Sequence, residues 1–198
     1  MIIACINAYQ DERFIKNAII SVLDKVDRII VVDGVYEGFE LYNFKPYSTD
    51  RTVIIAENLG CEIIETRWGW KDQVEKRNAY LVGGDGDWYF MIDADERLHG
   101  ELKPGEEDSY RIQCQFRKSL IPLLRLFKHQ EGIKYIGGHN IISVNDKIIL
   151  ENESPVLKDC WIEHFTDLRG EDRQRRKNQY YGYQYQIERE FREENGLP

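Results

Sequence analysis

Three carboxylates stand within four residues at Asp93, Asp95 and Glu96, directly after the apolar run WYFMI of residues 88–92. Such a run is typical of a strand buried on both faces, and open α/β sheets bind ligands beyond the carboxyl ends of their strands. In extended chain Asp93 and Asp95 point to the same side, where they repel each other unless a cation lies between them. The stretch therefore predicts a Mg²⁺ or Mn²⁺ site that holds a phosphate-bearing substrate, the alternative being a solvated acidic turn.

A buried cation is predicted next to these acids. Arg77 shares the apolar stripe of Val74 and Leu81 on a helix expected over residues 72–82. A guanidinium on the inward face of a helix needs a partner, because its desolvation is costly. The acids at Asp93 and Asp95, or a phosphate, are natural partners, and the alternative is that Arg77 extends past the core edge to water.

The first half of the chain alternates strands and helices. Continuous apolar strands separated by amphipathic helices imply a parallel sheet with right-handed crossovers. Asp11 is expected to cap the first helix, and residues 35–47 are expected to form a loop. The strands are expected at residues 2–6, 28–32, 61–65 and 88–92, and the helices at 11–23, 48–58 and 72–82.

The second half has a different pattern of short strands and turns. We expect antiparallel strands here, with Pro122 on an edge strand, and a polar segment 167–194 that has one narrow helical stripe. The fold class is therefore α/β, with a mostly parallel sheet covered by helices on both faces, a small antiparallel addition and a C-terminal helix. The later strands are expected at residues 109–116, 121–127, 133–136, 141–144, 147–150 and 159–163.

Composition narrows the class of protein. The chain has 198 residues, of which 42% are hydrophobic and 31% are charged, as expected of one globular domain. Its net charge of −8 argues against general nucleic-acid binding. No signal peptide or membrane span is expected, and a cytoplasmic location follows. Four separated cysteines without a CxxC pair predict buried free thiols in a reducing compartment, namely Cys5, Cys61, Cys114 and Cys160.

Several motifs in order resemble the family 2 glycosyltransferases with the GT-A fold, over residues 1 to about 165. The resemblance implies a GT-A domain at 1–166, with a nucleotide-sugar-binding half at 1–96 and an acceptor-side half at 97–166, followed by a helical tail at 167–198. The motifs are NAYQDE at 7–12, Asp33 at the end of the second strand, STDRT at 48–52, KRN at 76–78, DWYFMIDADE at 87–96, LRLF at 124–127 and GGH at 137–139.

The resemblance implies a role for each donor-side residue. Main-chain atoms near Ala8 and Tyr9 would border the base of a nucleotide-sugar, such as a UDP- or GDP-sugar. Asp33 would contact the base or the ribose, and Arg77 would face the diphosphate or the acids.

The resemblance also implies a metal site. Asp95 would ligate the metal that bridges the diphosphate, and Asp93 would hold the ribose or a metal-bound water. His164 matches a C-terminal histidine that completes the metal site in a number of GT-A enzymes, the alternative being an ordinary histidine. Imidazole with carboxylate suits Mn²⁺ better than Mg²⁺.

The acceptor side departs from the family pattern. His139 matches the histidine of a His-Glu pair found in some members, but Asn140 stands in place of the glutamate and cannot take a proton. Inverting transfer needs a base near the acceptor hydroxyl. Glu151 and Glu153 are the first candidates and Glu163 is another, while each could equally be a solvated acid.

The tail carries a group of basic residues and a group of tyrosines, and each group has alternative roles. A group of basic residues could bind the phosphates of a lipid-linked acceptor or a membrane surface, or could form a solvated helix face. A tyrosine cluster could stack on sugars, pack on the domain or make a homodimer contact. The basic residues are Arg169, Arg173, Arg175, Arg176 and Lys177, and the tyrosines are Tyr180, Tyr181, Tyr183 and Tyr185.

The resemblance thus implies a metal-dependent, inverting transfer of a hexosyl or similar sugar to a glycan, lipid-linked or protein-glycan acceptor. One alternative is a nucleotidyltransferase, although residues 7–12 lack the glycine and lysine expected of its phosphate loop. The other is a non-catalytic GT-A-like binding protein. A dehydrogenase is disfavoured because no G-x-G-x-x-G follows the first strand.

Overall fold

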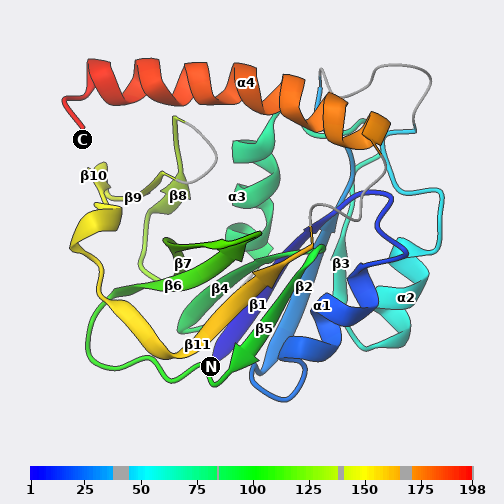
Figure 1. Ribbon diagram of the computed structural model, residues 1–198, viewed down its shortest axis with the longest axis horizontal. Helices are drawn as coiled ribbons and strands as arrows, with labels where there is room; N and C mark the ends of the chain where they lie inside the picture. The colour runs from blue at the N-terminus through cyan, green and yellow to red at the C-terminus, as the bar shows by residue number, and fades with distance from the viewer. Residues whose placement is uncertain (38–44, 84, 138–140, 166–170, 198) are drawn as a thin grey trace.

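The computed structural model describes residues 1–37, 45–83, 85–137, 141–165 and 171–197 (Figure 1). An eight-stranded sheet has the order β3-β2-β1-β4-β7-β6-β11-β5, and a three-stranded sheet has the order β10-β9-β8. The large sheet consists of β1 (Ile2–Ala8), β2 (Arg28–Asp33), β3 (Glu62–Ile64), β4 (Trp88–Asp93), β5 (Glu96–Gly100), β6 (Ser109–Phe116), β7 (Ser119–Lys128) and β11 (Val156–His164). The small sheet consists of β8 (Ile133–Tyr135), β9 (Ile142–Val144) and β10 (Lys147–Ile148). The helices are α1 (Ile15–Val22), α2 (Thr52–Asn58), α3 (Gln73–Gly83), α4 (Glu171–Glu194) and the short 3-10 helix η1 (Glu151–Glu153).

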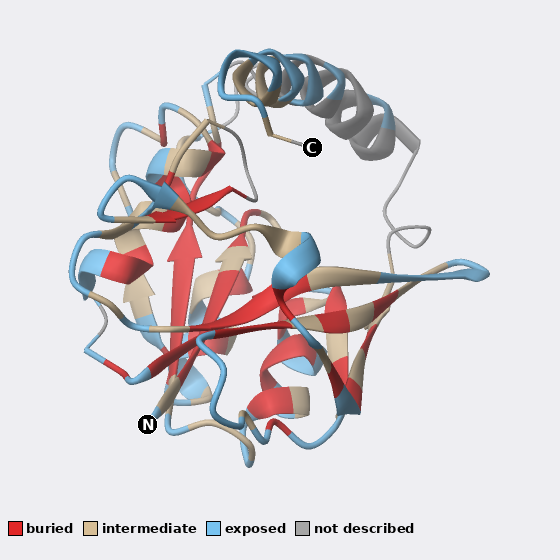
Figure 2. Ribbon diagram, turned by 90° about the vertical axis from the view of Figure 1, so that its left-hand side faces the viewer, coloured by how far each residue is buried: buried red, intermediate tan, exposed pale blue. Residues whose placement is uncertain are grey.

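The first four strands form the parallel half of the large sheet. β1 pairs in parallel with both β2 and β4, and β2 pairs in parallel with β3. Five consecutive residues of β4, from Trp88 to Ile92, are buried, because helices cover both faces of the sheet. The predicted mixed α/β class is confirmed, including the small antiparallel sheet and the C-terminal helix (Figures 1 and 2).

Two apolar clusters lie on the two faces of the sheet. On one face Ile15 and Ile19 of α1 and Ala56 of α2 pack against inward side chains of the strands. On the other face Tyr80 and Leu81 of α3 pack with residues of the small sheet. The side chains of β1, β2 and β4 alternate between the two clusters, so a continuous apolar strand is needed where both faces are covered.

The added strands alter the sheet direction. β7 is antiparallel to β4 and β6, whereas β11 is parallel to β6 and antiparallel to β5. The expectation that Pro122 marks an edge strand is wrong, because β7 lies inside the sheet. In the described part of the chain, however, β7 pairs with β4 only at Leu126–Lys128, so Pro122 lies on a stretch that is paired with β6 alone. The proline therefore costs no ladder bond on the other side.

Two helices begin later than the sequence suggested. Asp11 does not cap α1, whose N-cap position is Phe14 without a side-chain bond. The Asp11 carboxylate instead accepts the Tyr9 N–H at 3.1 Å, and the Asp11 N–H donates to Thr52 Oγ1 at 2.6 Å. Ser48 lies outside α2 because its backbone and hydroxyl bond to Asp33. Short polar side chains that bond the backbone locally compete with helix formation.

The four cysteines are buried and free, as predicted. Among the described residues, no helix has the length and apolar character required to cross a bilayer. The helix α4 lies outside the sheet, beside α3 and the small sheet (Figure 1). The division of the chain at residues 96 and 166 stays a prediction.

Candidate functional site

A tight turn at the carboxyl end of β4 gathers the acidic residues. β4 ends at Asp93, and after Ala94 and Asp95 the chain enters β5 at Glu96. The sequence suggested that Asp93 and Asp95 lie on one side of an extended strand, and this expectation is wrong. The turn brings them together instead, and the Asp95 carbonyl accepts the N–H of Phe165 at 2.8 Å, which ties the turn to the end of β11.

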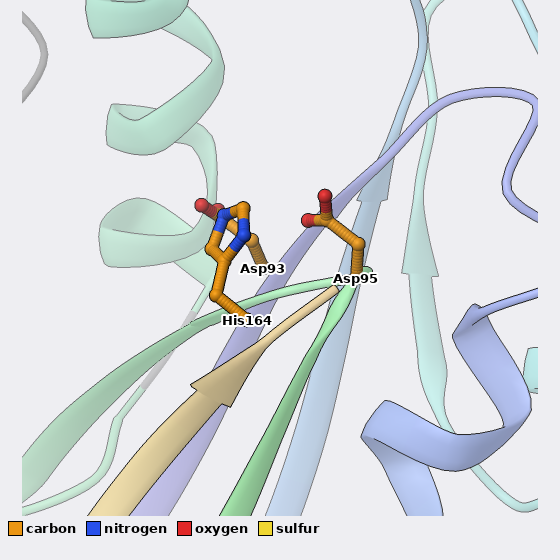
Figure 3. Close-up of side chains that lie close together, drawn as sticks. All are labelled: Asp93, Asp95 and His164. Atoms are coloured by element: carbon orange, nitrogen blue, oxygen red, sulfur yellow. The ribbon is translucent and has the colours of Figure 1, made fainter. Parts of the chain in front are cut away.

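The third member of the group comes from β11. His164 is the last residue of this strand and pairs with Glu96 of β5 in the antiparallel ladder. One ligand atom from each of Asp93, Asp95 and His164 lies within 4.8 Å of the other two. Figure 3 shows the three side chains extending to the same side of the sheet edge. Two carboxylates and an imidazole are a donor set that fits a divalent transition metal such as Mn²⁺.

Arg77 lies beside this group. Its side chain is only 4% exposed, and its Nη2 is 3.9 Å from Asp93 Oδ1. Nη1 lies 3.0 Å from Met91 Sδ, and Nε has no hydrogen-bond partner among the described residues. Of the two predicted acidic partners, Asp93 lies at ion-pair distance from Arg77, and the alternative of a side chain extended to water is wrong.

A buried ion pair lies behind the turn. Glu96 Oε1 accepts a hydrogen bond from Arg125 Nη2 at 2.7 Å, and Glu96 Oε2 accepts the Asp93 N–H at 2.7 Å. Burial raises the pKa of Glu96 to about 7, against the lowering effect of Arg125. The sequence pointed to Glu96 only as one of three neighbouring acids, and it gave Arg125 no role. The arginine within the apolar stretch LRLF could have indicated this ion pair, because a buried guanidinium needs an anion as its partner.

Lys76 joins the ends of two strands and was also missed. Its Nζ donates at 2.8 Å to the carbonyl of Ala8, the last residue of β1, and at 2.7 Å to that of Gly34, which directly follows β2. The residue is 2% exposed, and burial lowers its pKa to about 8, opposed chiefly by the charge of Asp33. Lys76 therefore holds the two strand ends at a fixed separation.

Asp33 is bonded within the protein. It has no exposed surface, and its two carboxylate oxygens accept the Ser48 N–H at 2.7 Å and the Ser48 hydroxyl at 2.5 Å. Burial raises its pKa, and the bonds from Ser48 oppose the rise. The Tyr9 hydroxyl donates to the Lys45 carbonyl at 2.8 Å. The ends of β1 and β2 thus carry the expected residues Ala8, Tyr9 and Asp33. Both carboxylate oxygens of Asp33 are occupied by Ser48.

The candidate bases lie on two elements: Glu151 and Glu153 form the ends of η1, and Glu163 directly precedes His164 in β11. Glu151 is in η1, and its Oε1 accepts the Leu124 N–H at 2.7 Å. It lines a cleft of about 320 Å³ whose lining includes none of the three predicted metal ligands. Glu153 is exposed, and Glu163 Oε2 lies 2.9 Å from His99 Nε2.

Some predicted residues fall outside the described part of the chain. His139 and Asn140 are among them, as is Arg169. In α4 the side chains of Arg175 and Tyr185 are described, and both are exposed. The side chains outside the described set are Arg173, Arg176, Lys177, Tyr180, Tyr181 and Tyr183.

Comparison with known proteins finds bacterial relatives. An uncharacterized glycosyltransferase of Rickettsia bellii is 35% identical over 121 residues, which are 61% of this chain and 36% of the relative. A second, from Rickettsia felis, is 35% identical over 61% of this chain and 38% of the relative. The resemblance to glycosyltransferases is confirmed. A TPR repeat-containing protein of Synechococcus elongatus is 24% identical over 76% of this chain and 37% of its own length.

The chain spans little more than a third of the length of these relatives. No family model matches the sequence. Among solved structures, S. aureus TarS 1-349 in complex with UDP aligns with a TM-score of 0.41 and 18% identity, over 50% of this chain and 29% of that one. Glucosyl-3-phosphoglycerate synthase from Mycobacterium tuberculosis, with Mn²⁺ and UDP, aligns with a TM-score of 0.39 and 23% identity, over 48% of this chain and 34% of that one.

Proposed function

We propose that the protein is a metal-dependent glycosyltransferase that moves a hexosyl or similar sugar from a UDP- or GDP-sugar to an acceptor hydroxyl. The observation that carries the proposal is the approach of Asp93, Asp95 and His164 to within 4.8 Å of one another. They do so at the carboxyl edge of a parallel sheet, where α/β proteins bind ligands. The names of the Rickettsia relatives support the same reaction class.

These three residues would hold Mn²⁺ or Mg²⁺. A bound metal of this kind is a Lewis acid that stabilises the charge developing on a nucleoside diphosphate as it leaves. The imidazole of His164 favours Mn²⁺ over Mg²⁺. Arg77, buried beside Asp93, adds positive charge at the same place and retains an Nε donor that no described residue uses.

The other donor-side residues would shape the nucleotide site. Lys76 fixes the carboxyl ends of β1 and β2 through the carbonyls of Ala8 and Gly34. The main chain at Ala8 and Tyr9, which would border the base, lies at the fixed end of β1. In this proposal Asp33 acts through the Ser48 hydroxyl that it holds, or contacts the nucleotide after Ser48 moves. A rigid edge of this kind orients the sugar for transfer without further ordering.

For the acceptor half of the reaction we propose an inverting mechanism with Glu151 or Glu153 as the base. The acceptor would be a glycan, a lipid-linked or a protein-glycan hydroxyl on the side of His139 and Asn140. Glutamine at either acid would remove a base that contributes about 10²–10⁴-fold to turnover while leaving donor binding intact. Membrane contact through Arg175 and its basic neighbours, and a homodimer, belong to the same proposal.

A non-catalytic binding protein is the second candidate. Asn140 occupies the position where a base is expected, and the Glu151 carboxylate is committed to the Leu124 N–H. Such a protein would bind nucleotide weakly or not at all and would show no turnover with any donor. A nucleotidyltransferase has less support, because the loop after β1 lacks glycine and lysine.

The test is a calorimetric titration of UDP, GDP, CDP and ADP, each with Mn²⁺, with Mg²⁺ and with EDTA. We expect one diphosphate to bind in the presence of metal and to lose at least tenfold in affinity in EDTA. A ligand that binds the native state also raises its melting temperature, which provides an independent readout. Failure of all four diphosphates to bind a folded protein would overturn the proposal.

A further inference from the structure

We propose that Glu96 and Arg125 are positioning residues that fix Asp93, Asp95 and His164 in the arrangement that binds metal. This inference rests on the proposed metal site. Neither residue would touch the metal, and both would act through the backbone and side chains of those that do. The first observation is that Glu96 lies at the centre of the group, connected to all three of its members.

The connections of Glu96 are direct. Its Oε2 accepts the backbone N–H of Asp93 at 2.7 Å, so it holds the last residue of β4. Asp95 is its chain neighbour, and the backbone of Glu96 pairs with that of His164 between β5 and β11. Its Oε1 also lies 3.9 Å from His164 Nε2. A rotation of the Glu96 side chain would therefore disturb the turn and the imidazole together.

Arg125 fixes the Glu96 carboxylate from a different strand. It projects from β7, whose last residues pair with the first half of β4, and its Nη2 donates to Glu96 Oε1 at 2.7 Å. The side chain of Glu96 has no exposed surface and that of Arg125 is 8% exposed. The pair thus lies inside the sheet, where neither side chain can exchange its partner for water.

A contribution to folding stability does not by itself explain the presence of the buried ion pair between Glu96 and Arg125. Desolvation of a buried ion pair often cancels its attraction, and apolar replacements of similar size are frequently neutral or stabilising. A pair kept only for stability would need no contact with the turn. Here Glu96 Oε2 accepts the backbone N–H of Asp93. Glu96 Oε1 accepts a hydrogen bond from Arg125 and lies 3.9 Å from His164 Nε2. This arrangement is what support of metal ligands requires, because outer groups that orient ligands control metal affinity.

The test compares the wild type with the double variant Glu96→Gln/Arg125→Met. Glutamine keeps the shape and can still accept the Asp93 N–H, and methionine leaves no buried charge unpaired. The probe is Mn²⁺ alone, followed by the paramagnetic resonance signal of the free ion, which measures weak affinities. We expect the double variant to bind Mn²⁺ roughly 10- to 100-fold more weakly, with a metal-free melting temperature close to that of the wild type.

The matched control is Arg28→Met/Glu62→Gln. This ion pair joins β2 to β3 with two contacts of 2.7 Å, far along the sheet from the turn. We expect its Mn²⁺ affinity to stay within twofold of the wild type. If the first double variant does not fold, Arg125→Lys replaces it. That variant keeps the charge but loses the planar fork of the guanidinium, and we expect an affinity loss of at least threefold.

The outcomes separate the two proposals. Equal Mn²⁺ affinity of a folded Glu96/Arg125 variant and the wild type would overturn the positioning role and leave the metal site standing. A wild type that binds no Mn²⁺ would overturn both. A loss confined to the Glu96/Arg125 variants, at unchanged melting temperature, supports the positioning role, since a merely structural pair would change stability rather than metal affinity.

Discussion

The proposed donor and acceptor sides of this protein differ in how firmly their polar groups are held. Four charged side chains near the carboxyl ends of β1, β2 and β4 are buried, with exposures of 0% for Asp33, 2% for Lys76, 3% for Arg77 and 1% for Glu96. The acids proposed for the acceptor side lie on η1 and the end of β11 and are exposed or half-buried. A diphosphate has one shape and charge whatever sugar it carries, so a rigid site suits it. Acceptors vary, and surface segments can change without loss of the core.

The largest expected effect is on the donor side. We expect Asp95→Asn to weaken metal-dependent diphosphate binding by roughly 100-fold, the upper range for loss of support at a metal site. The same calorimetric titration measures it. Asp146→Asn, on the exposed turn before β10, is the control and should bind as the wild type does. Equal binding by the Asp95 variant would remove the distinction between the two sides.

The buried lysine gives a prediction about pH. Burial lowers the pKa of Lys76 in the folded protein to about 8 from its ordinary value of 10.5. Between these values the unfolded chain binds more protons, so this residue makes the free energy of unfolding rise as pH rises. We expect the stability of the wild type, relative to Lys76→Met, to increase by about 2–3 kcal/mol from pH 7.5 to pH 10.5.

Urea unfolding of both proteins across this pH range measures the difference and cancels the other groups. Lys134→Met is the control, because its ammonium is half exposed and pairs with the exposed Asp146. Its stability curve should run parallel to that of the wild type. A parallel curve for Lys76→Met would show that this ammonium is not desolvated in the native protein.

The smallest effects are expected on the acceptor side. Glu151→Ala loses the bond to the Leu124 N–H, and we expect it to destabilise the fold by about 1 kcal/mol. Glu153→Ala, on an exposed side chain, should change stability by less than about 0.5 kcal/mol. Both variants should bind the diphosphate within twofold of the wild type. A tenfold loss in either would place that acid in the donor site.

The same contrast explains what the sequence could predict. Strands such as Trp88–Asp93 carry an unbroken apolar pattern, so their burial and direction could be predicted. An acidic partner for Arg77 could be predicted too, because a cation on a buried helix stripe requires an anion. The bond from Arg125 to Glu96 joins residues 29 positions apart through the sheet order β4-β7-β6-β11-β5, which no local pattern encodes. The turn at Asp93–Glu96 was misread as extended chain for the same reason.

The most direct test of the central claim is an anomalous difference map from crystals soaked with Mn²⁺ and the diphosphate selected by titration. The proposal predicts one strong peak bounded by Asp93, Asp95 and His164 and in contact with the diphosphate oxygens. A bound diphosphate with no peak between these three side chains, or a manganese peak elsewhere, would contradict it.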